Sequence, residues 1–404
     1  MSVSALDEIK LYVFHHHHYL DVPEDHERYR NSMIDYSNAH FDPELGHALY
    51  DRHLRTLVRA DQLGFDGIAI NEHHSMVYSM SPCVSLLAAR LTAVTQNAKI
   101  MVAGTPVNLM YPNRVAEEYA MLDVMSAGRM EYAFPLGTGM EYWSNEGTIN
   151  PTTARGRFRE SLDVIMRSWT EDGPIRYDGE FYNYRFLNPW PKPYQKPYPK
   201  SFIVGTGSEE TVSLAIDYGL GYSIVFVPIP NQLRAFARMR ELAEERGRLV
   251  DPDDLIIVVM AYVADTDEQA VQEARPHFER FFSWFHRVTP KFLVPPGYVT
   301  PKEFLRRASE KAMAKSTEAS WDDMVSVGRI ACGSPDTVAD TIVSWCEEAG
   351  AGRVNVVLEN GDMPEWKTVK NMTMFAEEVM PRIKAKLGHG AKTGQREVSK
   401  AGAR

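Results

Sequence analysis

The chain has 404 residues, of which 44% are hydrophobic and 24% charged, a composition of soluble globular proteins that excludes disordered and fibrous classes. Its formal net charge of −10 argues against a nucleic-acid binder, which needs a basic stripe to neutralise phosphates. Three cysteines cannot form a disulfide framework. No apolar run approaches the roughly 18–20 residues that span a bilayer, and the N-terminus lacks signal-peptide features. We therefore expect a reduced, cytoplasmic protein without membrane or nucleic-acid partners.

Short apolar runs alternate along the chain with longer amphipathic stretches, which predicts repeated strand–helix units. The predicted strands are residues 11–14, 65–70, 99–103, 129–134, 202–204, 222–227, 255–263 and 353–358. The predicted helices are residues 47–63, 82–94, 114–125, 154–170, 209–217, 232–246, 335–349 and 366–387. The strands lack period-two alternation, as strands buried on both faces do. Eight such units predict an α/β fold, a (β/α)₈ TIM barrel forming one domain over residues 1–387.

Two stretches interrupt this rhythm, after the fourth and seventh predicted strands. Residues 173–200 hold six prolines and many tyrosines, which predicts an inserted β-hairpin and extended segment. Residues 276–328 are predicted to be an irregular insertion that includes the aromatic run FFSWF at 281–285. The small and polar residues 388–404 are predicted to be a disordered tail.

In a barrel of this kind, active-site side chains lie at the carboxyl ends of the strands. His15–His18 follow the first predicted strand, and the sequence NEHH at 71–74 follows the second. Later strand ends carry Gly104–Pro106, the segment PLGTGMEY at 135–142 and the segment GTGS at 205–208. These positions are where the chemistry is expected.

The histidine run after the first strand has several interpretations. His15 and His17 lie two apart on a strand and point the same way, as metal ligands would. A catalytic zinc takes three protein ligands, however, and the ends of the fifth, sixth and eighth predicted strands offer no histidine. We therefore expect no metal. The run could also be a solvated loop without a role, whereas its internal position argues against a purification tag. The remaining interpretation is an organic-cofactor site in which one histidine acts as acid or base.

The GTGS segment at 205–208 opens a predicted helix directly after the fifth strand. Helix N-termini present backbone N–H groups to phosphates, and small residues allow close approach. The motif alone is weak and is often a plain turn. Its position favours a phosphate site.

Several segments, taken in order, carry a resemblance to a known family. They are GFDGIAINEHH at 64–74, YPNRVAEEYAMLDVMSAGRMEYAFPLGTGMEY at 111–142, PKSFIVGTGSEETVSLAIDYG at 199–219, CGSPDTVADTI at 332–342 and VMP at 379–381. Over residues 8–387 the chain resembles the bacterial luciferase-like flavin-dependent monooxygenases. The resemblance implies a barrel that binds reduced FMN and activates O₂ as a flavin C4a-hydroperoxide to oxygenate a small apolar or aromatic substrate. It also implies a separate NAD(P)H:flavin reductase, because no G-x-G-x-x-G fingerprint follows the first strand.

The resemblance also assigns roles to individual residues. His73 becomes the catalytic acid or base, with Glu72 orienting it or supporting local hydrogen bonds, and His74 structural. Gly104 and Thr105 would lie against the flavin ring. The family often has a cis non-proline peptide there, whereas here Pro106 would make a cis bond cheaper.

The cofactor phosphate would be bound by Arg155, with hydroxyl and backbone donors from the strand-5 loop. The other expected cofactor residues are Thr138, Gly205, Gly207, Ser208 and Thr211. Leu136 stands where luciferase has a second arginine, and Arg157 is a candidate replacement or a surface residue.

The resemblance places substrate residues at the pocket mouth: His15, His17, Tyr142, Trp143 and Phe285. The aromatic run around Phe285 could equally be packing. A homodimer is expected through Leu86, Leu87, Leu91 and Met121, which could equally be core.

Three other functions remain open. The first is an oxidoreductase of the same fold that transfers hydride with the deazaflavin F420. The second is a metal-dependent barrel hydrolase, and the third is a non-catalytic flavin-binding protein.

Overall fold

The architecture is a closed barrel of eight parallel strands. The structure, a computed structural model, describes residues 6–144, 150–225, 227–285, 287–295, 297–299, 301 and 320–387. The barrel strands, in order around the ring, are β1 (Lys10–His15), β2 (Gly67–Ile70), β3 (Lys99–Ala103), β4 (Met130–Pro135), β7 (Ser201–Gly205), β8 (Gly221–Ile224), β9 (Leu255–Val263) and β11 (Arg353–Val357). Parallel pairing of β11 with β1 closes the ring. The predicted TIM barrel is confirmed.

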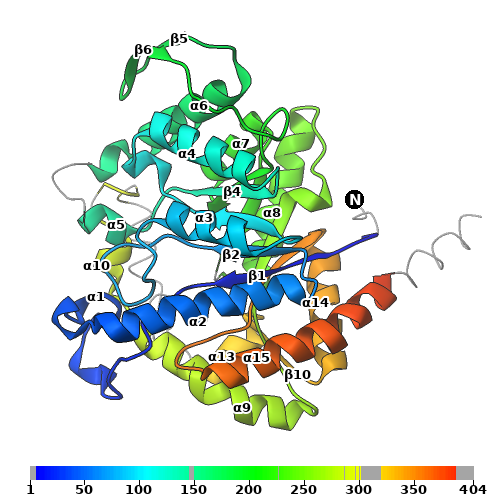
Figure 1. Cartoon of the computed structure of the whole chain (residues 1–404). Coiled ribbons are helices and arrows are strands. Elements are labelled where there is room, and N and C mark those ends of the chain that lie inside the picture. Colours follow the sequence, from blue (N-terminus) through cyan, green and yellow to red (C-terminus); the bar gives the residue numbers. More distant parts are fainter. Residues whose placement is uncertain are drawn as a thin grey trace, which may run out of the picture.

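Helices surround this barrel on its outside (Figure 1). The longer ones are α2 (Pro43–Gln62), α3 (Val84–Val94), α4 (Pro112–Met125), α6 (Ala154–Thr170), α7 (Glu209–Tyr218), α8 (Ile229–Glu245), α9 (Asp267–Arg280), α14 (Pro335–Ala349) and α15 (Glu365–Met374). Shorter helices are α1 (Ser32–Asp35), α5 (Gly139–Ser144), α10 (Pro290–Leu293) and α13 (Trp321–Ser326). Local chemistry starts and ends them. Asp42 caps α2 by accepting the backbone N–H groups of Glu44 and Leu45, and Gly219 ends α7 at φ 67°.

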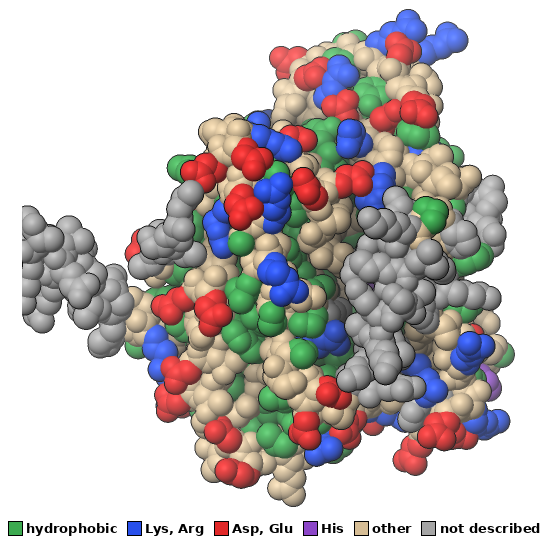
Figure 2. Space-filling model, turned by 180° about the vertical axis from the view of Figure 1, so that it is seen from behind, with side chains coloured by type: hydrophobic (Ala, Val, Ile, Leu, Met, Phe, Trp, Pro, Cys, Tyr) green, Lys and Arg blue, Asp and Glu red, His purple; other side chains and the backbone are tan. Residues whose placement is uncertain are grey.

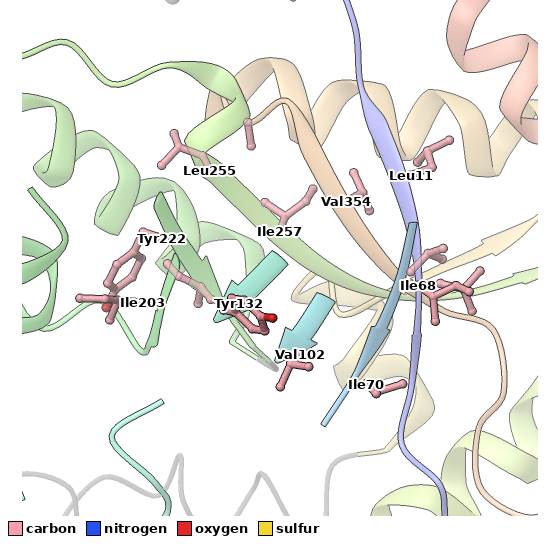
Figure 3. Close-up of a cluster of buried hydrophobic side chains, with 14 of the residues drawn as sticks. Leu11, Ile68, Ile70, Val102, Tyr132, Ile203, Tyr222, Leu255, Ile257 and Val354 are labelled. Atoms are coloured by element: carbon pink, nitrogen blue, oxygen red, sulfur yellow. The ribbon is translucent and has the colours of Figure 1, made fainter. Parts of the chain in front are cut away.

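Side chains of each strand alternate between two buried layers. Leu11 and Val13 pack outward with the helices, whereas Tyr12 and Phe14 belong to the cluster inside the barrel. Figure 3 shows the outward layer, in which side chains from many strands, Val354 among them, gather in one buried cluster. Both faces of the barrel strands are therefore buried and mostly apolar, which explains the apolar runs in the sequence; charged exceptions inside the barrel are Glu131 of β4 and Arg353 of β11, which pair at 2.7 Å.

The first predicted insertion is confirmed as a hairpin. β5 (Ile175–Asp178) pairs antiparallel with β6 (Asn183–Leu187), and the pair stands beyond α6 at the top of Figure 1. The Glu160 carboxylate of α6 accepts the backbone N–H groups of Glu180 and Phe181 at 2.7 and 3.0 Å and so fixes the hairpin tip.

The second predicted insertion is wrong at both ends. At its start, α9 runs through Pro276 to Arg280, and residues 281–285 continue it as a π-helical turn. At its end, the helix α13 (Trp321–Ser326) lies within the predicted irregular stretch, and just beyond the stretch an unpredicted ninth strand, β10 (Ile330–Gly333), pairs with the distal half of β9. No helix was predicted over residues 267–280, and the four-residue strand was too short to be recognised. The middle of this stretch and the predicted tail 388–404 lie outside the described residues.

Candidate active site

A histidine–glutamate pair lies at the carboxyl ends of β2 and β4. Nδ1 of His73 is 2.7 Å from Oε1 of Glu141, which is buried on α5. Burial by itself raises the pKa of Glu141, but hydrogen bonds from His73 and Thr138 outweigh it, so that pKa lies below its usual range. An ionised Glu141 selects the His73 tautomer with its proton on Nδ1, which leaves the Nε2 lone pair to accept a proton.

Glu72 does not contact His73 in the manner expected of an orienting residue. Its Oε1 accepts from Nε2 of His74 at 3.3 Å, and its Oε2 accepts from the Val84 backbone at 3.1 Å and the Thr105 hydroxyl at 3.2 Å. The prediction that Glu72 orients His73 directly is therefore wrong. The other predicted role, support of the local hydrogen bonds, agrees with these contacts. Residues 72 and 74, two apart, share one side, and His73 points to the other.

Glu141 is the partner that sequence reasoning missed. Its signal was present as the only acidic residue in the segment PLGTGMEY. The short helix α5 turns this residue back over the barrel end, and a helix of six residues leaves no periodic pattern by which to predict that turn. Thr138, expected to bind the cofactor, instead donates its backbone N–H and hydroxyl to Glu141.

The histidine run divides between the two faces of β1, and the expected pair points the wrong way for a substrate. His15 and His17 pack against His53 of α2, with Nε2 of His15 2.7 Å from Nδ1 of His53. His16 and His18 point to the opposite side, where both lie against Tyr78. The placement of His15 and His17 at the substrate is therefore wrong. Strand alternation separates the two pairs, but the sequence alone does not reveal which pair faces inward.

Tyr78 connects the inward-facing pair to the catalytic candidate. Its ring is 4.8 Å from that of His73 in an edge-on contact, and its hydroxyl is 3.2 Å from Nδ1 of His16. Phe285 stacks on His18 at 4.4 Å. The structure thus brings Phe285 to this cluster. Tyr142 is also buried, and its hydroxyl donates to the Leu136 carbonyl at 2.8 Å, while Trp143 contacts the ring of Phe292.

A second group of predicted residues surrounds a hollow between α6 and α7. It is lined by Leu136, Arg155, Phe158, Arg159, Glu210, Thr211 and Leu214. Ser208 caps α7, with its hydroxyl 2.8 Å from that of Thr211, which in turn is 2.7 Å from the Tyr222 hydroxyl. Backbone N–H groups at a helix start and two arginines suit a phosphate, although Arg155 already pairs with Glu210 of the same hollow at 2.8 Å. Arg155 and Thr211 are therefore brought together.

The loop between β7 and α7 contains two glycines, Gly205 and Gly207, and close packing requires both of them. A Cβ at Gly205 would lie 2.1 Å from the Tyr222 hydroxyl, and Gly207 has φ +87° with Ala235 2.6 Å from an added Cβ. The loop is thereby kept against β8, and its amides open α7 beside the hollow.

Leu136 lacks the positive charge of the arginine expected at its position. The cation that could compensate for it is Arg159, which lies one turn beyond Arg155 on α6 and lines the same hollow. Arg157 points elsewhere, since its Nε donates to the Asn108 carbonyl at 3.1 Å and its guanidinium lies over Tyr182 at 4.9 Å. The suggestion that Arg157 replaces the missing arginine is wrong. Helical geometry explains the difference, because residues four apart share a face and residues two apart do not.

Gly104 sits where β3 ends, and its peptide bond with Ala103 is cis. The non-proline cis peptide is therefore present at this strand end, and the expectation that a cheaper cis bond at Pro106 would take its place is wrong. Thr105 is buried beside Gly104 and bonded to Glu72. A Cβ at position 104 would lie 1.8 Å from the carbonyl oxygen of Ala133, so only glycine fits here.

Gly104→Ala is expected to lower the free energy of unfolding by about 3 kcal/mol or more, because the added methyl cannot be accommodated without moving β4. Gly247→Ala is the matched control. Gly247 has φ +66° and open space around it, so its substitution should cost only about 1 kcal/mol. Denaturant unfolding of both variants checks this, and equal losses would contradict it.

Behind β1, a buried polar network joins the outward histidines to the end of β11. Ligand-type atoms of His15, His53 and Glu359 lie within 4.8 Å of one another. The 2.7 Å separation of the two imidazole nitrogens is that of a hydrogen bond, and Arg52 pairs with Glu359 at 3.1 Å. A guanidinium beside the carboxylate disfavours a second cation there. This arrangement suits a hydrogen-bonded network better than a metal site.

Glu359 makes stability depend on pH. Burial raises the pKa of its carboxyl to about 7 despite the neighbouring Arg52. Because this native pKa exceeds the unfolded one, folding favours the protonated form, and stability falls as pH rises from about 4.5 to about 7, by about 3 kcal/mol. Glu359→Gln should remove this fall. Unfolding free energies at pH 5 and pH 8 test it, and an unchanged difference between the two pH values would contradict it.

Comparison with known proteins decides the family. A family model described as luciferase-like monooxygenase matches residues 35–353. The chain belongs to this family. The alkanal monooxygenase alpha chain of Photobacterium leiognathi is 23% identical over 339 residues, which cover 83% of this chain and 93% of that protein. The predicted enzyme class, a flavin-dependent monooxygenase, is confirmed.

Solved structures of luciferase-like proteins share the fold. The oxygenating constituent of 3,6-diketocamphane monooxygenase from Pseudomonas putida, solved with FMN, has a TM-score of 0.70 at 19% identity and covers 93% of this chain and 99% of its own. An F420-dependent secondary alcohol dehydrogenase, in complex with an F420–acetone adduct, has a TM-score of 0.66 at 17% identity, with the same coverage. Of these two proteins that share the fold, one was therefore solved with FMN and the other with an F420 adduct.

The surface of this luciferase-like protein carries no single-sign field on the face that Figure 2 shows. Basic and acidic side chains are interspersed there, and no basic stripe of the kind that binds nucleic acid is seen. Among the described residues, no helix combines the length and apolarity needed to cross a membrane.

Proposed function

We propose that this chain is the oxygenating component of a two-component monooxygenase that uses reduced FMN and O₂. The observation that carries the proposal is the joint presence, at the strand ends of one barrel, of a phosphate-type hollow and a His–carboxylate pair. Arg155, Arg159 and the start of α7 would hold the phosphate. Gly104 would allow a flat ring to approach β3.

Reduced flavin, when bound, supplies the two electrons with which one oxygen atom enters the substrate and the other leaves as water. His73 would accept and return a proton at Nε2, and the buried Glu141 would stabilise the transient imidazolium. The aromatic side chains beside His73 would exclude water from the reaction. The substrate is proposed to be a small apolar or aromatic molecule.

The reduced cofactor would come from a separate NAD(P)H:flavin reductase. The likeness to a protein named as the oxygenating constituent of its monooxygenase supports this division of labour. Hydride transfer with F420 is the second candidate, supported by the likeness to the F420-dependent alcohol dehydrogenase.

The decisive experiment is an anaerobic titration of the purified chain with FMN, reduced FMN and reduced F420, followed by admission of oxygen. Tight binding of reduced FMN, with an oxygen-dependent absorbance transient that is shortened in His73→Ala, supports the monooxygenase. Binding of reduced F420 alone, without any such transient, would replace it with hydride transfer.

A homodimer through α3 and α4 is also proposed. Leu86 and Met121 are 72% and 54% exposed, whereas Leu91, expected in the same patch, is buried in the core. The double variant Leu86→Lys with Met121→Lys is expected to convert a dimer into a monomer, because two charges would be desolvated in the interface. Light scattering after gel filtration measures this, and a wild-type monomer would contradict it.

A further inference from the structure

The inward-facing half of the histidine run forms an aromatic and imidazole cluster beside His73, which we call the β1 mouth. It consists of His16, His18, Tyr78, Phe281 and Phe285. His18 is central, since it stacks on Phe285 at 4.4 Å and its ring lies 5.3 Å from that of Tyr78. Phe281 and Phe285 come from the π-helical turn that follows α9. Such turns often occur at functional sites.

The hydrogen-bond accounting of this cluster leaves an acceptor without a donor. Nδ1 of His18 lies 2.5 Å from the Tyr78 carbonyl, which can only accept, so Nδ1 carries the proton. Nε2 of His18 is then a lone-pair acceptor, and it is buried without a partner among the described residues. Burial lowers the pKa of His18 to about 3, so the ring stays neutral and Nε2 stays an acceptor at physiological pH.

Asn71, at the end of β2, presents a second acceptor to the same cluster. Its Nδ2 is 3.4 Å from Nδ1 of His16, whose ring lies 5.3 Å from that of His18. Its Oδ1 is buried and also lacks a partner within the described part of the chain. Buried polar atoms in native proteins are nearly always paired, so two unpaired acceptors in one aromatic cluster indicate a missing donor.

We propose that the β1 mouth is a substrate subsite that binds an uncharged hydrogen-bond donor on an aromatic ring, a phenolic hydroxyl whose single proton is shared between Nε2 of His18 and Oδ1 of Asn71 as a three-centre bond. This inference rests on the proposed monooxygenase function, because it names the substrate class of that site. The aromatic side chains match a flat apolar ring. The nearby carboxylate, Glu141, is already bonded to His73 and Thr138, so no free negative charge favours a cationic donor.

The subsite also orients the substrate. Tyr78 contacts the β1 mouth on one side and His73 on the other, with ring distances of 5.3 and 4.8 Å. Because Tyr78 contacts both rings, a phenol anchored at His18 would lie at the same barrel end as His73. His18 and Asn71 are in this sense specificity-determining residues of the proposed reaction.

The test uses two probes of similar shape, 4-fluorophenol and 4-fluoroanisole, titrated into the full chain and followed by ¹⁹F NMR. The methyl ether lacks the donor and leaves both acceptors unpaired, so wild type should bind the phenol about tenfold or more tightly. His18→Phe keeps a ring against Phe285 but removes the acceptor, and should bring the two affinities within about twofold. Asn71→Leu is the second variant and should reduce the preference in the same direction.

His47→Phe is the matched control, because His47 lies on α2 with its side chain 81% exposed. It should keep the wild-type preference. Equal affinities in wild type, no binding of either probe, or a preference that survives in both folded variants would overturn the proposal. The titration needs no flavin. A chain that prefers the phenol but fails to bind reduced FMN would overturn the proposed function and not the subsite, and the reverse result would overturn only the subsite.

Discussion

His73→Ala should lower the rate of substrate oxygenation by about 10²–10⁴-fold, the usual contribution of a positioned acid or base. The variant should still bind the cofactor, because His73 lies at the ends of β2 and β4 and not at the hollow between α6 and α7. We expect O₂ to continue to reoxidise the flavin, with hydrogen peroxide released in place of the oxygenated product. Product yield per flavin oxidised, together with FMN affinity, measures both parts of this expectation.

Glu141→Gln separates positioning from proton transfer at the same site. The amide keeps the shape and can accept from Nδ1 of His73, but it cannot stabilise a charged imidazolium, so we expect an intermediate loss of about 10-fold. A smaller loss in Glu141→Gln than in Glu141→Ala identifies Glu141 as a positioning residue. His47→Ala, an exposed change on α2, is the control. Full activity in His73→Ala would refute the assignment of the acid or base.

Arg155→Ala is expected to weaken binding of FMN about tenfold and to leave riboflavin, which lacks the phosphate, unaffected. A charge-assisted hydrogen bond to a buried phosphate is worth more, but Arg155 is 36% exposed, and solvent screening reduces the effect. Arg159 lines the same hollow, so its substitution should act in the same direction. Fluorescence titration with both flavins gives the ratio.

Glu210 should oppose the same phosphate. Its carboxylate pairs with Arg155 at 2.8 Å at the first turn of α7 and would repel a dianion placed in the hollow. Glu210→Gln is therefore expected to tighten FMN binding several-fold, in the opposite direction to Arg155→Ala. The matched control is Arg167→Ala, because Arg167 lies on α6 as Arg155 does but pairs with Glu171. An equal loss of FMN and riboflavin in Arg155→Ala would show that this arginine supports the fold and not the phosphate.

The barrel could be predicted from the sequence because its signals are local. Every barrel strand is buried on both faces, so β9 appears as an uninterrupted apolar run and β3 as an apolar run after Lys99, and both were predicted with correct bounds. The start of α7 was predicted for a similar reason, since a small-residue loop and its capping Ser208 lie next to each other in the chain. Strand β10 was missed because its pairing with β9 depends on residues about 70 positions away.

The candidate site was only partly predictable because its geometry is set by contacts between distant segments. His73 could be singled out as a candidate from its place at a strand end, but its partner Glu141 is 68 residues away and reaches it only through the turn of α5. Whether β1 presents His15 or His16 to the interior depends on the register of that strand against β2 and β11, which the four identical residues conceal. Sequence by itself therefore determined the strand–helix rhythm and the positions of the strand ends, which follow from burial along one segment. Tertiary structure alone decided which side chains meet there, because strand register and helix rotation set the direction of each one.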